Sequence, residues 1–495
     1  MTDLTRRSVN GLLVGAALLT GTGTIGSREA VANTEAMPGT TPADDIAVLR
    51  AAMEIHPGAL RYLNPAILDA GLSSLSETFE QTDGLASRYL ALSKFLATLR
   101  CGHTYANFYN QSAPLRSALF DRKTRLPFAF RWIGDLMVVT EASPKLNLPR
   151  GSVVTRINRV GAEDMLRSLM PYTRADGSAF VKRKALLEVQ HREKFEYFDI
   201  FHGLVYGEPA GGVHRIEYTD PKGRSRTLDS APISLAERQE ARSAKAATLG
   251  NEEPAWTFDE RDGIGVLTMA DWSTYSKKWD WQSWLDTRLD QAASLRGLII
   301  DNRQNEGGDP KVGAHLLSRL IDKPLRPPSY ARLVRFRTLP DSLRSFTKTW
   351  DPNFYELGRD AKDLGRGFFQ LPEVSDAAQQ IQPRGKQVNV PTVLLTSPTN
   401  SSATFTFARI AKASGRMRLV GGTTGGNYRG INGDGYFFTT LPHSGIEFDV
   451  PIVGKFPLTP QPDAGVSPDL MVKESVAAIV KGKDRTMDAA VSLLS

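Results

Sequence analysis

Apolar positions between about residues 41 and 109 recur at helical spacing. In the stretch 92–99, leucine and phenylalanine side chains occupy positions i, i+3, i+4 and i+7, which form one face of an α-helix. Gly102 follows this stretch, and we expect it to end the helix because glycine adopts the left-handed conformation without strain. The pattern predicts a helical N-terminal region with His103 directly after its last helix.

Short apolar runs replace the helical spacing between about residues 127 and 233. We expect strands at FAFRWI, LMVVTEA, GSVVTRIN and VHRIEYTD, and one helix at about residues 162–170. The segment LPRGSVVTRINRVGAEDMLRSLM resembles the core of a PDZ domain, a module that binds extended peptides by adding a strand to a sheet edge. Residues 120–240 are therefore predicted to form a PDZ-like, β-rich module.

Strands and helices alternate from about residue 254 onward. The expected strands are GIGVLTM, GLIIDNR, TVLLTS and RLVGG, and the expected helices are residues 279–295, PKVGAHLLSRLI and SATFTFARIAKA. The continuous apolar run at residues 298–300 is typical of a strand that is covered on both faces of its sheet. This pattern predicts an α/β domain.

Two strand-to-helix turns of this domain carry residues that could do chemistry. Gly307 and Gly308 precede Asp309, the expected N-cap, so their backbone N–H groups would face an anion at a helix start; a plain tight turn is the alternative. Ser401 and Ser402 lie at the start of the next helix. A serine there is either an N-cap or a nucleophile whose neighbouring N–H groups stabilise an oxyanion.

The first 32 residues have the pattern of a signal peptide. A Thr-Arg-Arg-Ser motif with arginines at positions 6 and 7 precedes an apolar run from residue 11 to about 25, and AVA follows at 30–32. The paired arginines resemble a twin-arginine export signal, with an uncleaved anchor as the alternative. No later run approaches the roughly 18 apolar residues of a membrane helix. We expect a periplasmic or secreted protein without a stable membrane anchor.

The amino-acid composition excludes several classes of function for this protein. The 495 residues are 41% hydrophobic and 23% charged, which is typical of globular proteins and long enough for two or three domains. The net charge of +7 is spread along the chain, so no nucleic-acid partner is expected. The single cysteine excludes an intramolecular disulfide, and no cluster of His, Cys and acidic residues has metal-ligand spacing, so no metal or cofactor is expected.

Four motifs, in order along the chain, resemble those of the tail-specific, or C-terminal processing, serine peptidases of family S41. They are LATLRCGHT, GLIIDNRQNEGGD, the segment 393–426 and GVSPDLMV. The resemblance implies a crotonase-like α/β catalytic domain at residues 250–495. Along the chain, this domain comes after the signal peptide (1–32), the N-terminal helical region (33–115) and the PDZ-like module (120–240). The resemblance also implies a peptide or protein substrate.

The resemblance assigns the nucleophile and the base. The family's Ser-Ala-x-x-x-Phe-Ala core falls on residues 402–408, so Ser402 is the implied nucleophile and Ser401 a structural hydroxyl, with a one-residue slip as the alternative. His103, from the family's Gly-His-Thr, is the implied base, because VGGTTGGNYRG has no lysine where the other branch of the family carries one.

The resemblance also implies an oxyanion hole and a third catalytic group. Backbone N–H groups of Gly307, Gly308 and Ala403 would hold the oxyanion. Tricorn-like members carry a glutamate just before Gly-x-x-Pro-Asp, whereas this chain reads QPDAGVSPD, where Asp463 is the nearest carboxylate. The motifs therefore do not identify the third catalytic residue, and Asp463 is the candidate for it.

Three functions fit these observations. The first is an exported serine peptidase, and the second is a non-catalytic binding protein on the same scaffold. The third, a cysteine peptidase built on Cys101 and His103, is disfavoured because side chains two residues apart have difficulty meeting.

Replacing both Arg6 and Arg7 with lysine should leave the precursor in the cytoplasm, because twin-arginine export depends on the guanidinium pair and not on charge alone. Cell fractionation measures the outcome, and Arg28→Lys in the same segment is the matched control. Normal export of the double variant would contradict the assignment.

Overall fold

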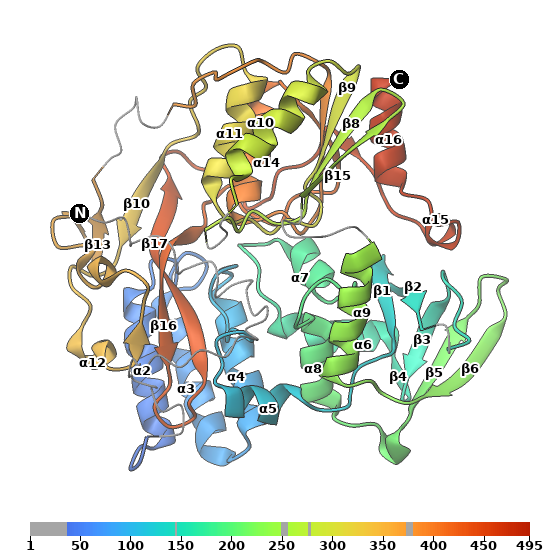
Figure 1. Cartoon of the computed structure of the whole chain (residues 1–495). Coiled ribbons are helices and arrows are strands. Elements are labelled where there is room, and N and C mark those ends of the chain that lie inside the picture. Colours follow the sequence, from blue (N-terminus) through green and yellow to red (C-terminus); the bar gives the residue numbers. More distant parts are fainter. Residues whose placement is uncertain (1–36, 144–145, 249–255, 276–278, 373–379) are drawn as a thin grey trace, which may run out of the picture.

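The protein, described here from a computed structural model, has a mixed α/β fold built around three sheets (Figure 1). The structure describes residues 37–143, 146–248, 256–275, 279–372 and 380–495. The predicted signal peptide and its arginine pair lie outside these ranges. The mixture of helices and sheets confirms the predicted α/β class.

A mainly parallel six-stranded sheet forms the centre of the C-terminal part. In spatial order, its strands are β18 (Leu470–Met471), β15 (Arg418–Gly421), β14 (Thr392–Thr396), β9 (Gly297–Asp301), β8 (Ile264–Met269) and β7 (Trp256–Arg261). Only the edge strand β7 is antiparallel to its neighbour. The strands confirm the predicted alternation, and β9 is buried along its whole length, as its continuous apolar run predicts.

Helices cover both faces of this sheet (Figure 1). On one face lie α10 (Trp281–Ala292), α11 (Pro310–Leu320) and α14 (Ser402–Ser414), whose apolar side chains pack with the sheet in one core. On the other face lies α16 (Arg485–Leu494), preceded by the short α15 (Val476–Val480). The sheet is thus a rigid support for the turns at its edge.

The turns before α11 and α14 emerge side by side, because β9 and β14 are parallel neighbours and their carboxyl ends lie at the same edge. Asp309 caps α11 as predicted, with its side chain accepting a hydrogen bond from the Lys311 N–H at 2.9 Å. Helix α14 ends at Gly415, whose φ of 65° is left-handed.

A second, antiparallel sheet was not predicted from the sequence. Its strands are β11 (Thr347–Lys348), β16 (Asn432–Thr440), β17 (Glu447–Pro457), β10 (Tyr330–Val334), β13 (Phe368–Gln370) and β12 (Lys362–Gly365). The short helices α12 (Asp341–Arg344) and η3 (Pro352–Glu356) lie in its connections. The apolar side chains of this sheet join those of the N-terminal helices in one continuous core.

The N-terminal region is helical, as predicted. Its helices are α2 (Pro42–Ile55), α3 (Pro65–Gln81), α4 (Leu85–Thr98) and α5 (Ala113–Phe120). The predicted role of Gly102 is wrong, because α4 ends at Thr98 and it is Arg100 that takes the left-handed conformation, with φ of 51°. Gly102 is required for space instead: a Cβ atom there would lie 2.8 Å from Asp176 Oδ2.

The middle region holds the third sheet. Its strands are β1 (Phe128–Ile133), β2 (Leu136–Ala142), β3 (Val153–Ile157), β4 (Val160–Gly161), β5 (His214–Thr219) and β6 (Ser225–Ser230). The four predicted strands are confirmed, as is the predicted helix, α6 (Ala162–Leu169). The remaining helical elements are η1 (Met170–Tyr172), α7 (Phe180–Leu186), α8 (Tyr197–Tyr206), η2 (Ala210–Gly212) and α9 (Leu235–Thr248).

The prediction of one helix between residues 127 and 233 is therefore incomplete. Residues 198–204 of α8 are all buried, so the helix has no polar face to reveal its period in the sequence. Among the described residues, no helix combines the length and the apolar character needed to cross a membrane.

Helices α8 and α9 are joined by a buried ion pair. Arg238 donates to Asp199 Oδ2 and Oδ1 at 2.8 and 3.1 Å, and the side chains are 1% and 2% exposed. Arg125 lies 3.9 Å from the same carboxylate. Asp199 is thus the countercharge for two buried guanidinium groups.

Asp199→Ala should lower the free energy of unfolding by about 3–5 kcal/mol, because it leaves both guanidinium groups buried without a countercharge. Urea unfolding measures this. The control is Asp69→Ala, which removes an exposed partner of Arg50 and should cost no more than about 1 kcal/mol. Equal losses for the two variants would contradict the prediction.

Candidate active site

One cavity of about 1200 Å³ lies where all three parts of the chain meet. Its lining includes His103 from the N-terminal region, Arg174 and Lys182 from the middle region, and Glu306, Gly307, Gly308, Ser401, Ser402 and Ala403 from the edge of the parallel sheet. Of the predicted site residues, the structure thus gathers Ser402, His103, Gly307, Gly308 and Ala403 around one space.

Ser402 is the first residue of α14 and is half-buried. Its φ of 50° places a non-glycine residue in the left-handed region, which costs about 1–2 kcal/mol. The extended N-cap position belongs to Ser401, with φ of −138°, so Ser402 does not act as the N-cap. Strain of this kind persists where the surrounding structure enforces it, as it does at functional sites.

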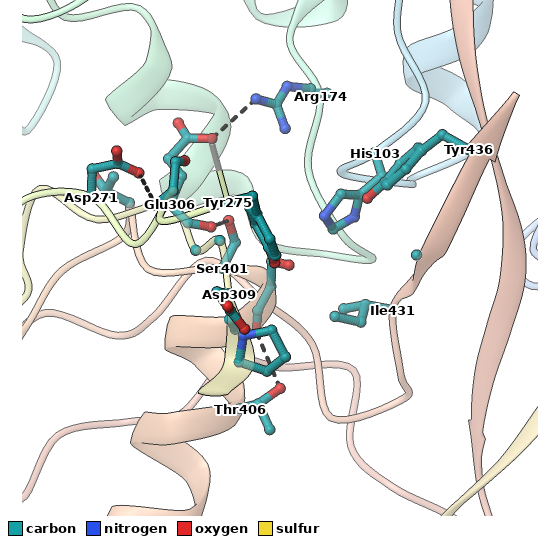
Figure 2. Close-up of a pocket in the computed structure, with 18 of the residues that line it drawn as sticks. His103, Arg174, Asp271, Tyr275, Glu306, Asp309, Ser401, Thr406, Ile431 and Tyr436 are labelled. Atoms are coloured by element: carbon teal, nitrogen blue, oxygen red, sulfur yellow. Dashed lines mark hydrogen bonds and ion pairs between the residues drawn. The ribbon is translucent and has the colours of Figure 1, made fainter. Parts of the chain in front are cut away.

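Ser401 is buried, and its hydroxyl both accepts and donates a hydrogen bond. Its Oγ accepts a hydrogen bond from Lys182 Nζ at 2.6 Å and donates one to the Glu306 carbonyl at 3.0 Å. The serine hydroxyl therefore joins the start of α14 to the turn before α11, which is a structural role (Figure 2).

The double-glycine turn lies directly against Ser402. Gly307 and Gly308 have φ of 127° and 130°, and a Cβ atom on Gly307 would lie 2.8 Å from the Ser402 Cβ. The Gly307 N–H donates to Asn305 Oδ1 at 2.8 Å. Within the described residues, the N–H groups of Gly308 and Ala403 have no acceptor. Two of the three predicted oxyanion donors are therefore available in this conformation.

His103 faces the same cavity, with its ring beside that of Tyr436 at a centroid distance of 5.9 Å (Figure 2). Its Nδ1 is buried and has no hydrogen-bond partner in the described part of the chain. Burial lowers the pKa of His103 to about 4, and Asp176 is the charged neighbour that opposes this shift most. The imidazole is thus neutral near pH 7 and able to accept a proton.

Asp463, the predicted candidate for the third group, is bound elsewhere. Its Oδ1 accepts from the Ser178 N–H at 2.9 Å and from Asn427 Nδ2 at 2.6 Å, and its Oδ2 accepts from Ser178 Oγ at 2.8 Å. These bonds hold Asp463 against the turn at residues 177–178, and the structure does not bring it together with His103.

The sequence did not reveal a charged network in the lining of the cavity. Glu306 Oε2 lies 3.0 Å from Arg174 Nη2 and 3.5 Å from Lys182 Nζ, and Arg174 also donates to the Gly102 carbonyl. Burial lowers the pKa of Lys182. Burial also opposes the ionisation of Glu306, but Lys182 and Arg174 hold the pKa of Glu306 below its usual value. The only sequence signal was the acidic residue before the double glycine.

Residues 263–432 match the model of peptidase family S41. This segment belongs to that family. The S41 segment contains both turns of the site, whereas His103, Arg174 and Lys182 lie outside it. The comparison with curated proteins found no match.

Two solved structures of CPAF are similar to the chain over most of its length. Mature CPAF complexed with lactacystin is 14% identical, with a TM-score of 0.63 over 92% of this chain and 97% of that chain. Mature CPAF alone gives 14% identity and a TM-score of 0.61, covering 92% and 96%. The photosystem II D1 C-terminal processing protease gives 16% identity and a TM-score of 0.39, covering 90% and 98%. The likeness to CPAF establishes a shared fold.

Gly307→Ala should slow the reaction of Ser402 with a fluorophosphonate probe by at least about 10²-fold, because the added methyl group would push against the Ser402 Cβ and misplace the hydroxyl. Probe labelling followed by mass spectrometry measures the rate. Gly134→Ala is the control, since Gly134 is also left-handed but has nothing within 4 Å of an added Cβ. Unchanged labelling of Gly307→Ala would contradict this geometry.

Proposed function

We propose that this protein is an exported serine peptidase that hydrolyses peptide bonds, with Ser402 as nucleophile and His103 as base. Membership of the segment 263–432 in family S41 supports peptidase activity. The observation that carries the residue roles is the strained Ser402 at the start of α14, which lines the same cavity as His103. The substrate is a peptide or a protein.

In the first step, Ser402 Oγ bonds to the carbonyl carbon of the scissile peptide while its proton passes to His103 Nε2. Nε2 is the ring nitrogen in this role because Nδ1 is buried. The carbonyl electron pair moves onto oxygen, and the N–H groups of Gly308 and Ala403, together with the positive end of α14, stabilise the negative charge.

In the second step, the oxyanion collapses, the peptide C–N bond breaks, and His103 passes its proton to the leaving amine. Water then attacks the acyl-Ser402 ester, again giving a proton to His103, and the proton returns to Ser402 Oγ as the acid product leaves. Each cycle consumes one water and needs no cofactor.

Lys182 has a structural role in this scheme. Its ammonium is committed to Ser401 Oγ and to Glu306, so it fixes the turn before Ser402. A one-residue slip of the nucleophile would instead pair Ser401 with Lys182 as its base, and the Ser401 variant below separates these assignments.

The finer fold and the location are part of the same proposal. The catalytic part would be crotonase-like, and residues 120–240 would form a PDZ-like module whose edge strand β6 accepts an extended substrate segment. The signal peptide would place the mature protein in the periplasm or outside the cell.

A non-catalytic binding protein on the same scaffold is the second candidate. It is favoured by one observation: His103 Nδ1 has no carboxylate bonded to it in the described residues. Such a protein would bind peptides in the cavity without cleaving them.

Ser402→Ala and His103→Ala should each lower kcat by about 10³-fold or more, and the double variant should be hardly worse than either, because the two residues act as one unit. Ser401→Ala should keep most of the activity. Peptide cleavage assays and fluorophosphonate labelling of Ser402 measure these effects.

Each alternative has its own signature in the same experiment. Absence of Ser402 labelling in the wild type, with peptide binding undiminished in Ser402→Ala, would favour the binding protein. Loss of activity in Ser401→Ala but not in Ser402→Ala would favour the slipped nucleophile.

A further inference from the structure

We propose that Asp176 is the positioning carboxylate for His103: it orients the imidazole and stabilises the imidazolium that forms when His103 takes the Ser402 proton. This inference rests on the proposed peptidase function. It supplies, from the middle region, the third group that the segment before Gly-x-x-Pro-Asp lacks.

A hydrogen bond joins Asp176 to Gly102, the residue that precedes His103. Asp176 is 2% exposed, and its Oδ1 accepts a hydrogen bond from the Gly102 N–H at 2.8 Å. The carboxylate packs so closely on Gly102 that a Cβ atom there would lie 2.8 Å from Asp176 Oδ2. A negative charge is therefore fixed against the residue that precedes the base.

Asp176 and His103 each carry one buried polar atom without a partner. Within the described chain, neither Asp176 Oδ2 nor His103 Nδ1 makes a hydrogen bond. A buried acceptor left without a donor is costly, by about 1–3 kcal/mol or more for a charged group. When Nε2 accepts the Ser402 proton, Nδ1 carries a hydrogen and the ring becomes a cation, which is the partner that Asp176 Oδ2 lacks.

The charges around His103 support this role. The charged groups that act on the imidazole are Asp176, Arg174, Lys182 and Glu306. Arg174 and Lys182 disfavour the imidazolium, and both are already paired with Glu306. Of the two carboxylates, Asp176 has the larger effect in favour of the imidazolium. Asp176 is thus the principal group that can offset the burial of the protonated ring.

The turn that carries Asp176 is held on three sides. The Gly177 N–H donates to the Arg100 carbonyl at 2.9 Å, and Asn427 Nδ2 contacts the Asp176 carbonyl at 3.4 Å. Asp463 accepts from both Ser178 and Asn427. Asp463 therefore acts indirectly, by fixing the turn that carries Asp176.

Asp176→Asn tests the charge with little change in shape, because the amide oxygen can still accept from the Gly102 N–H. We expect kcat to fall by on the order of 10²- to 10⁴-fold, with KM changed by less than about threefold. Removing the carboxylate also lowers the pKa of His103 below its value of about 4, so the acid limb of the kcat/KM profile should move to lower pH.

The matched control is Asp45→Asn in α2. Asp45 is fully buried and also accepts backbone N–H bonds, from His443 and Ser444 at 2.6 and 3.0 Å. This variant should lose stability without a comparable loss of kcat. A kcat for Asp176→Asn within threefold of wild type, or a loss that merely equals that of Asp45→Asn, would overturn the inference.

Chemical rescue adds a readout that a structural role would not move. Formate added to Asp176→Ala should raise its kcat at least tenfold. Formamide, which is neutral and of the same shape, should not raise it. Equal rescue by both would count against a role for the negative charge. Ser402 labelling in the wild type separates the two proposals. No labelling means that the peptidase function itself fails, and labelling with an unaffected Asp176→Asn means that only the role of Asp176 fails.

Discussion

The parallel pairing of β9 with β14 is the constraint on which the candidate site depends. Each strand ends at the same edge of the sheet and leads through a short turn into a helix. The pairing sets the double glycine against Ser402, at a separation that only glycine permits. Gly308 lies in the turn before α11 and Ala403 at the start of α14, and within the described part of the chain the N–H groups of both have no acceptor.

The site is completed by residues far from that sheet. Within a stretch of nine residues of the middle region, Arg174 binds the Gly102 carbonyl and Glu306, Asp176 binds the Gly102 N–H, and Lys182 binds Ser401 and Glu306. This stretch therefore links Gly102, the residue before His103, to both turns of the S41 segment. A rearrangement of the middle region would change the site through these bonds, even though the region contains neither Ser402 nor His103.

Several residues of the candidate site are held in positions or environments that lower the stability of the protein. Ser402 is held in a left-handed conformation, Lys182 is 1% exposed, and His103 is kept neutral by its surroundings. Each feature is unfavourable by itself. They persist because the parallel sheet, covered on both faces, and the core shared by the N-terminal helices and the antiparallel sheet supply the compensating burial.

The sequence by itself determined the local elements and the chemistry of the turns. Strands β1, β2, β8 and β9 and the cap at Asp309 follow from short-range periodicity and backbone preference. The resemblance of the motifs pointed to Ser402, His103 and the double glycine, because these residues lie within motifs that can be read along the chain.

Only the tertiary structure decided which distant groups meet. Lys182 contacts Ser401 across 219 residues of sequence, and Asp176 contacts Gly102 across 74. The antiparallel sheet likewise joins β10 to β17 across more than a hundred residues of chain. Such contacts leave no periodic trace, since a buried ion pair or hydrogen bond depends on the three-dimensional path of both segments and not on the spacing within either one.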